Sequence, residues 1–355
     1  MKENIPQTDE NIGGGKKGRW AIVSIVIAAL SIWAVTSQWK GFSLGHFIDY
    51  VSRAKPGWLA CAIVAMLGFV FFEGCALHAA CHALHYDPKQ SRCFSYAAAD
   101  IYFSAITPSA SGGQPACAYL MMKDGIPGIV STAVLLLTLA MYAMSILVIG
   151  IVSFLVRPSV LMAFGVPSRI LIGVGFAIQI GLAALFILLI KSESLLESLC
   201  RGTIGLLAKL HLLRRKEERL EKLERTMAEY RDCVALLSGH RPMLIKSFLF
   251  NLLQRASQIA VTMLVYLAMG GRMRQAIDIF AMQSYVVLGS NCVPIPGAMG
   301  VADYLMLDGF NAFLAQDQVA GMELLSRTIS FYSCVLLCGI TVLIVTHKLR
   351  KVVRR

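Results

Sequence analysis

Long apolar runs separated by short polar segments dominate this chain. Each run is close to the roughly 20 residues that an α-helix needs to cross the hydrocarbon core of a bilayer. The runs lie near 20–37, 58–82, 127–156, 168–190, 242–269 and 324–347. We therefore predict an all-α polytopic integral membrane protein with about six full spans.

Two helix-breaking stretches interrupt apolar sequence between these spans. The first reads ITPSASGGQP (106–115) and the second VPIPGAMG (293–300). Irregular backbone at membrane depth is tolerated only where protein buries it or a polar cavity hydrates it. We therefore predict two re-entrant or broken hairpins, at 91–122 and 275–310.

The spacing of the breaks predicts an internal repeat of opposite orientation. Pro108 lies 50 residues after the start of the second span at 58, and Pro294 lies 52 residues after the start of the fifth span at 242. Each half then reads as span, span, hairpin, span. Inverted repeats of this kind place substrate sites near the bilayer midplane, between the halves.

Charge orients the chain in the membrane. Lys16, Lys17 and Arg19 precede the first span, and the segment 348–355 carries five basic residues and no acidic one. Basic residues collect on the cytoplasmic side, so both termini and the charged 191–241 segment are predicted to be cytoplasmic. The predicted parts are a cytoplasmic tail (1–19), a first membrane half (20–156), a short loop with the fourth span (157–190), a cytoplasmic amphipathic basic segment (191–241), a second membrane half (242–347) and a basic cytoplasmic tail (348–355).

Composition excludes an ordinary soluble domain. The chain has 355 residues, 57% of them hydrophobic and only 15% charged, with a net charge of +12, whereas soluble domains carry about 25% charged residues. Ten cysteines occur without a CxxC pair, which indicates buried apolar positions in place of a disulfide framework. No small-residue cleavage site follows the first apolar run, so we expect an uncleaved span.

Polar side chains follow one face of the predicted fifth span. They are Ser247, Asn251, Gln254, Arg255, Gln258 and Thr262. Arginine inside a span is costly and faces the bundle interior or a hydrated cavity. Two interpretations stay open: Arg255 binds a lipid phosphate through its planar fork, or it forms a structural pair with an acidic residue such as Glu73 of the second span.

The breaks themselves carry candidate binding residues. Gly112, Gly113, Gly297 and Gly300 allow backbone conformations closed to other residues, and Pro108, Pro115, Pro294 and Pro296 stop helices. Half-helices that begin after the breaks would direct unpaired N–H groups inward, where they bind anions. Ser109, Ser111 and Gln114 add neutral donors, and the alternative is tight packing through small residues.

Signals for metal or enzyme chemistry are weak. His78 and His82 lie four residues apart with Cys75 and Cys81 nearby, but an aqueous interface explains these histidines better than a metal site does. No nucleophile–base arrangement, phosphate loop or dinucleotide fingerprint occurs. We therefore expect no metal, no cofactor, no nucleic-acid partner and no catalytic residue.

At this point the two breaks resemble known signatures. TPSASGGQPACAYLMMKDGIP (107–127) resembles the first signature of the lysylphosphatidylglycerol synthase/flippase transmembrane family, and PIPGAMGVADYLML (294–307) resembles the second. The resemblance covers essentially the whole chain. It departs at Asp303, where the family usually carries Glu, and near Cys117, where many members carry a basic residue.

The resemblance implies a flippase of phosphatidylglycerol or its aminoacyl ester in the bacterial inner membrane, with a role in membrane charge and in resistance to cationic antimicrobial peptides. The family label is often phosphatidylglycerol lysyltransferase, but the chain ends eight residues after its last span, so we expect no cytosolic synthase domain. Expected partners are an anionic phospholipid, a separate synthase and a second copy of the chain. The residues assigned to lipid binding are Glu73, Pro108, Ser109, Gly112, Gly113, Gln114, Pro115, Tyr119, Asn251, Gln254, Arg255, Gln258, Pro294, Pro296, Gly297, Gly300 and Asp303.

Two other functions stay open. A membrane-embedded transferase acting on a lipid headgroup or an isoprenoid phosphate would need an acid–base pair, for which Glu73, Asp100 and Asp303 are the candidates. A scaffold for a separate synthase would use the amphipathic helix predicted around 212–237, whose apolar positions recur at helical spacing. Loss of a lipid species in a deletion strain would indicate synthesis, and altered leaflet exposure would indicate transport.

Overall fold

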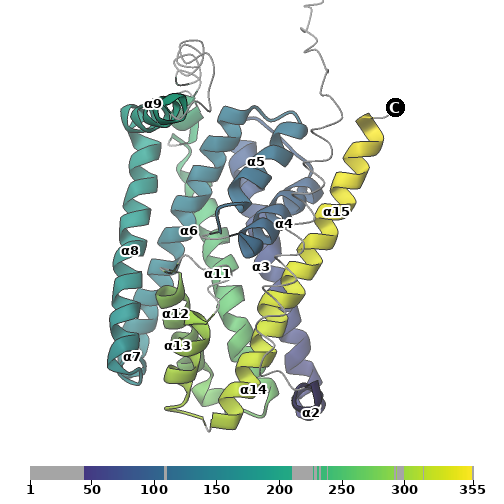
Figure 1. The fold of residues 1–355 in the computed structure, drawn as a ribbon, viewed down its shortest axis with the longest axis vertical. Helices are drawn as coiled ribbons and strands as arrows, with labels where there is room; N and C mark the ends of the chain where they lie inside the picture. The colour runs from purple at the N-terminus through teal and green to yellow at the C-terminus, as the bar shows by residue number, and fades with distance from the viewer. Residues whose placement is uncertain are drawn as a thin grey trace, which may run out of the picture. The chain divides into compact units, whose positions relative to one another are not determined.

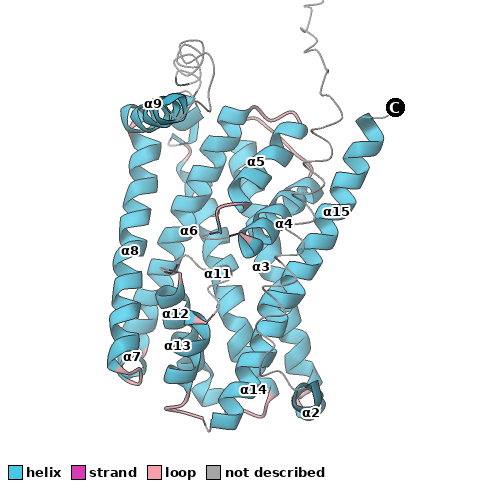
Figure 2. Ribbon diagram, viewed as in Figure 1, coloured by secondary structure: helices cyan, strands magenta, loops and turns pink. Residues whose placement is uncertain are grey.

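Helices form every regular element in the part of the chain that is described (Figure 2). The structure is a computed structural model that describes residues 44–107, 110–209, 239–291, 300–314 and 316–353, together with 227, 230, 231, 233–237 and 293. The first predicted span (20–37), most of the 210–238 segment and the break residues 108, 109 and 294–299 lie outside the described residues.

Five helices are long and apolar enough to cross a membrane. They are α3 (Pro56–Ala83), α6 (Gly128–Val156), α8 (Val166–Lys191), α11 (Arg241–Ala268) and a final helix, Gly321–His347, made from α14 (Gln316–Arg327), a π-helical turn (Thr328–Ser333) and α15 (Cys334–Val353). The predicted spans from the second to the sixth agree with these bounds to within three residues. The prediction of an all-α polytopic membrane protein is confirmed.

Proline marks where several of these helices begin. Pro56, Pro167 and Pro242 each occupy the first turn of a long helix. The first helical position has no use for an N–H donor, and the fixed φ of proline suits it. Shorter helices connect the spans: α2 (Leu44–Arg53), α7 (Pro158–Met162), α9 (Glu193–Lys209) and a 3₁₀ turn (Met273–Gln275).

Two broken hairpins enter the bundle from opposite ends. The first consists of α4 (Gln90–Ile106) and α5 (Gly113–Lys123), and the second of α12 (Ala276–Ser290) and α13 (Val301–Phe310). In Figure 1 the α4–α5 hairpin lies toward the end that carries α9 and the C-terminus, and the α12–α13 hairpin lies toward the end that carries α7. Thr107 ends α4 in an extended conformation, as a residue that precedes proline must.

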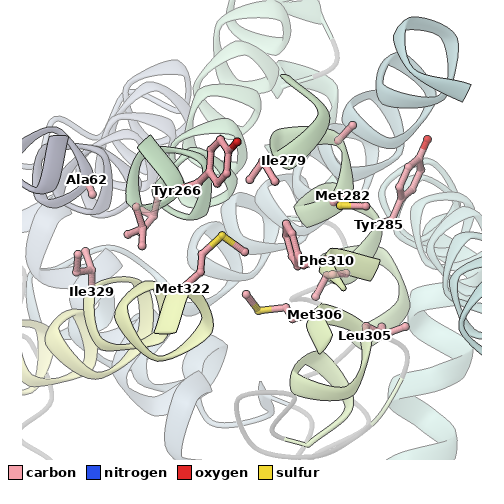
Figure 3. Packing of buried hydrophobic residues seen from close by; sticks show 14 of the residues in the cluster. Ala62, Tyr266, Ile279, Met282, Tyr285, Leu305, Met306, Phe310, Met322 and Ile329 are labelled. Atoms are coloured by element: carbon pink, nitrogen blue, oxygen red, sulfur yellow. The ribbon is translucent and has the colours of Figure 1, made fainter. Parts of the chain in front are cut away.

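The bundle is organised around α3 and α11, which contact each other and run in opposite directions (Figure 1). They correspond to the second and fifth predicted spans, which are equivalent in the predicted repeat. A buried apolar cluster fixes the second hairpin against α11 and α14, with Tyr266, Met282, Phe310 and Met322 among its members (Figure 3). The hairpins are thus held by packing on both sides of a central helix pair.

Candidate functional site

The first polar contact of the site joins the two central helices. Glu73 of α3 and Gln254 of α11 are buried, with 5% and 2% of their surface exposed. The Nε2 atom of Gln254 donates a 2.7 Å hydrogen bond to Oε2 of Glu73. A carboxyl group at this depth needs such a partner because no water competes for it. Gln254 is therefore the hydrogen-bond donor to Glu73, and among the described residues Arg255 forms no ion pair with Glu73.

The first hairpin brings a second carboxyl group beside Glu73. Asp100 of α4 accepts hydrogen bonds from Gln114 Nε2 (2.7 Å) and Ser104 Oγ (3.2 Å). The side chains of Asp100 and Glu73 are themselves in hydrogen-bond contact. Gly113 lets the hairpin close this tightly, since a Cβ atom there would lie 2.0 Å from Asp100 Oδ1.

Arg255 interacts electrostatically with this carboxyl pair but forms no ion pair with it in the described structure. Its Nη1 atom donates a 2.6 Å hydrogen bond to Gln258 Oε1, and its guanidinium lies over the Tyr142 ring at 4.0 Å and the Phe69 ring at 5.2 Å. Among the described residues it forms no ion pair with a carboxylate. Its Nε atom is buried without a hydrogen-bond partner.

Tyr142 connects Arg255 to the second hairpin. Its hydroxyl oxygen accepts a 3.1 Å hydrogen bond from Nδ2 of Asn291, the residue that caps the C-terminal end of α12. Arg255 also lies within electrostatic range of Asp100 in the first hairpin. The guanidinium therefore lies near α4 of the first hairpin and, through Tyr142, near the C-terminal end of α12 in the second hairpin.

The second hairpin has its own charged cluster. Gly300 has a positive φ of 79° and begins α13, a conformation that favours glycine. Asp303 accepts a 2.9 Å hydrogen bond from the Gly300 N–H and forms an ion pair with Arg327 of α14. Glu323 lies 4.0 Å from Arg327. Unlike Arg255, Arg327 is paired.

The half-helix starts do not offer the open anion sites that the sequence suggested. The first turn of α5 packs against the Asp100 carboxyl group through Gly113 and Gln114, and the first turn of α13 is capped by Asp303. A carboxylate of the protein already occupies the positive end of each helix dipole. An outside anion at either helix start would therefore have to displace a carboxyl group of the protein.

Unpartnered polar atoms continue along the same helix. Ser247 Oγ, Asn251 Oδ1 and Arg255 Nε follow one another at helical spacing on α11, and all three are buried without a hydrogen-bond partner in the described structure. Buried polar groups in proteins are nearly always bonded, so each exception requires a water molecule or a ligand. These atoms form a row along α11 that ends at Arg255.

Two apolar grooves lie along the central helices α3 and α11. One has a volume of about 440 Å³ and is lined by α3, α4 and α15, and the other has a volume of about 340 Å³ and is lined by α11, α12 and α6. Each half thus supplies two helices to its own groove and one to the other. Leu67, Phe71, Phe94 and Ala98 are among the lining residues of the first groove, and Leu252, Ala256, Ile277 and Ala281 are among those of the second.

Several residues assigned from the sequence are gathered here and others are not. Glu73, Gln114, Gln254, Arg255 and Gln258 lie in one connected cluster with Gly113. Gly112 instead donates its N–H to Thr107 Oγ1 within the break, and Asn251 lies one turn along α11. Gly300 and Asp303 belong to the separate cluster with Arg327.

Tyr119 and Pro115 join neither cluster. Tyr119 is 53% exposed and lies beside Lys123, and Pro115 is also exposed. Pro108, Ser109, Pro294, Pro296 and Gly297 lie outside the described residues.

Sequence reasoning missed Tyr142, Asn291, Glu323 and Arg327. Glu323 and Arg327 are charged residues four apart at the start of the last span, a signal that was available in the sequence. Tyr142 had none, because a single tyrosine in an apolar helix is ordinary. Asn291 follows the end of α12 and gains its role only from contact with Tyr142.

Comparison with known proteins gives one match. The family described as the lysylphosphatidylglycerol synthase TM region matches residues 21–338. A search of curated proteins found no sequence match. The match spans both hairpins and Arg255, and with the five spanning helices it makes the chain a membrane protein of a lipid-related family. The chain belongs to the lysylphosphatidylglycerol synthase transmembrane-region family.

Proposed function

We propose that this protein moves an anionic phospholipid, phosphatidylglycerol or its aminoacyl ester, between the leaflets of the bacterial inner membrane. The observation that carries the proposal is Arg255, a guanidinium near α4 and the end of α12 that has no carboxylate ion pair in the described structure and keeps a buried, unbonded Nε. A charge at this depth is retained for function when structure does not use it.

The chemistry of Arg255 fits a phosphodiester, which both lipids carry. A guanidinium presents its donors in a planar fork that matches phosphate geometry. The Tyr142 ring at 4.0 Å holds the plane of the guanidinium and leaves an edge for the anion. Neutral donors and acceptors on α11 supply partners for the glycerol hydroxyls.

The two grooves suit the acyl chains of such a lipid. One is lined by a helix of the hairpin that enters from the α9 end, and the other by a helix of the hairpin that enters from the opposite end. A lipid in either leaflet therefore has an apolar groove beside the same polar centre. We further propose that the α9 end is cytoplasmic, since the basic segment 348–355 begins within the last turns of α15 at that end.

The test is lipid movement in liposomes that contain the purified protein and a fluorescent phosphatidylglycerol. Dithionite added outside destroys only the dye in the outer leaflet. The protein should expose the inner pool, and Arg255→Ala should slow this exposure by about 10- to 100-fold, the loss expected for one charge-assisted hydrogen bond.

Arg201→Ala is the matched control, because Arg201 pairs with Glu197 on the surface of α9, away from the site. It should behave as the wild type. Exposure no faster than in protein-free liposomes, or an Arg255→Ala rate equal to that of the wild type, would refute the proposal. Loss of a lipid species in a deletion strain would instead favour the transferase alternative.

A further inference from the structure

The Glu73–Asp100 pair is the feature that lipid binding at Arg255 leaves unexplained. Both side chains are buried, with 5% and 9% of their surface exposed. Among the described residues, neither forms an ion pair with Lys, Arg or His. Their polar partners are the neutral side chains of Gln254, Gln114 and Ser104.

The contact between the two carboxyl groups implies a proton. Two carboxylate oxygens can form a hydrogen bond only if a hydrogen lies between them, and two ionised carboxylates side by side in an apolar bundle repel each other strongly. With one shared proton the pair carries a single negative charge. Arg255 carries a single positive charge within electrostatic range, so the empty site is neutral.

The other titratable groups around the carboxyl pair do not change the net charge of the site. Cys117 of α5 and Cys334 and Cys338 of the final span face it within electrostatic range. Buried thiols of this kind remain uncharged and inert. Within the described residues, Arg255 is therefore the fixed charge that opposes the pair.

One hydrogen-bond acceptor next to the carboxyl pair has no partner. Gln114 donates its Nε2 to Asp100, but its Oε1 is buried and has no hydrogen-bond partner. This vacant acceptor lies on the same amide that contacts the carboxyl pair. A second proton on the carboxyl pair would add one donor to the network to which this amide belongs.

We propose that Glu73 and Asp100 form a proton-binding site, and that a phosphodiester binding at Arg255 makes this pair take up one further proton. The inference rests on the proposed function. A monoanionic headgroup would leave the neutral site with one excess negative charge, and a second proton on the pair removes it. Anion and proton then favour each other's binding, as linkage requires, and the loaded site is again neutral.

The test measures phosphatidylglycerol binding to the full chain in nanodiscs of zwitterionic lipid, from about pH 5 to about pH 9, a range that brackets shifted carboxyl groups. The dissociation constant should rise with pH by up to about tenfold per pH unit, the slope for one linked proton. In weakly buffered solution, a pH indicator dye should report uptake of up to one proton per lipid bound.

Glu73→Gln combined with Asp100→Asn preserves shape and removes titration. This variant should bind phosphatidylglycerol at every pH as tightly as the wild type does at low pH, with no proton uptake. Asp87→Asn, at an exposed carboxylate beside His78, should keep the pH dependence of the wild type.

The outcomes separate the two proposals. Binding by the wild type that neither varies with pH nor takes up protons overturns this inference and leaves the proposed function intact. A double variant that keeps the wild-type pH dependence also overturns it. If the wild type fails to bind phosphatidylglycerol at every pH, the proposed anion site is itself refuted, and with it the proposed function. The dye measurement on the wild type decides the question even if the double variant does not fold.

Discussion

Gly113 sets how closely the two arms of the first hairpin approach each other. A Cβ atom at this position would lie 2.0 Å from both Asp100 Oδ1 and Ser104 Oγ, and 2.6 Å from the Asp100 carbonyl oxygen. Two of these atoms belong to the acidic site and one belongs to the backbone of α4. Little can move here without opening the hairpin or displacing the carboxyl group.

Gly113→Ala should therefore destabilise the protein by about 1–3 kcal/mol, the usual cost of overpacking, and slow lipid transport. Thermal unfolding in detergent measures the first effect and the dithionite assay the second. Gly173→Ala on α8 is the control, since nothing lies within 4 Å of its added Cβ. Equal unfolding temperatures for the two variants would contradict the close approach.

At the scale of single residues, the sequence predicted the types of side chain better than their partners. The stripe on α11 was visible because polar residues at helical spacing in a span are rare. The sequence did not show which of these residues contacts Glu73, because Gln254 and Arg255 are neighbours and a small rotation of the helix decides between them. The distance of 181 residues between Glu73 and Gln254 leaves no local signal.

Among elements, the contact between the second hairpin and the final helix depends on charge as well as on apolar packing. Asp303 at the start of α13 pairs with Arg327, and a π-helical turn begins directly after Arg327. Such turns are rare and are frequent at functional sites. The pair therefore ties a hairpin tip to the point where the last span changes its helical geometry.

A double-mutant cycle tests this tie. Asp303→Asn and Arg327→Ala should each lower stability, and the combined variant should lose less than the sum, with a coupling of about 0.5–3 kcal/mol. Thermal or denaturant unfolding in detergent measures each corner of the cycle. The Glu197–Arg201 pair on α9 is the comparison, where exposure keeps coupling below about 1 kcal/mol. Similar coupling in both cycles would show that Asp303 and Arg327 do not hold the hairpin.

The hairpins themselves could be predicted because proline and glycine have strong local effects. Their bounds, 90–123 and 276–310, agree closely with the predicted breaks. The charges of α14 were missed for a physical reason. Glu323 and Arg327 lie at the edge of an apolar run, where charged residues ordinarily face the aqueous interface, and only packing against α13 turns them inward.

At the scale of the whole molecule, each half of the chain contributes one helix to the groove that belongs mainly to the other half. Each apolar groove takes two helices from one half and one from the other. The offsets of 50 and 52 residues suggest a repeat, which stays a prediction, and they give no indication of the grooves. The grooves require α15 beside the first hairpin and α6 beside the second, contacts between segments far apart in sequence.

If both grooves carry acyl chains, filling either should slow transport. Leu67→Trp in the first groove and Ala256→Trp in the second should each reduce the rate of phosphatidylglycerol exposure several-fold. Ile245→Trp, on an exposed part of α11 that lines neither groove, should have little effect. A rate unchanged by both groove substitutions would exclude these grooves from the lipid path.

The hydrogen bond between Glu73 and Gln254 also constrains how the protein is made. During synthesis α3 and the first hairpin reach the membrane before α11 is made. The donor Gln254 is added 181 residues after Glu73. During that interval the carboxyl group has only Asp100 and the first half to shield it from lipid. The first half must therefore stay beside the insertion machinery, or keep its carboxyl groups protonated, until the second half arrives to complete the fold.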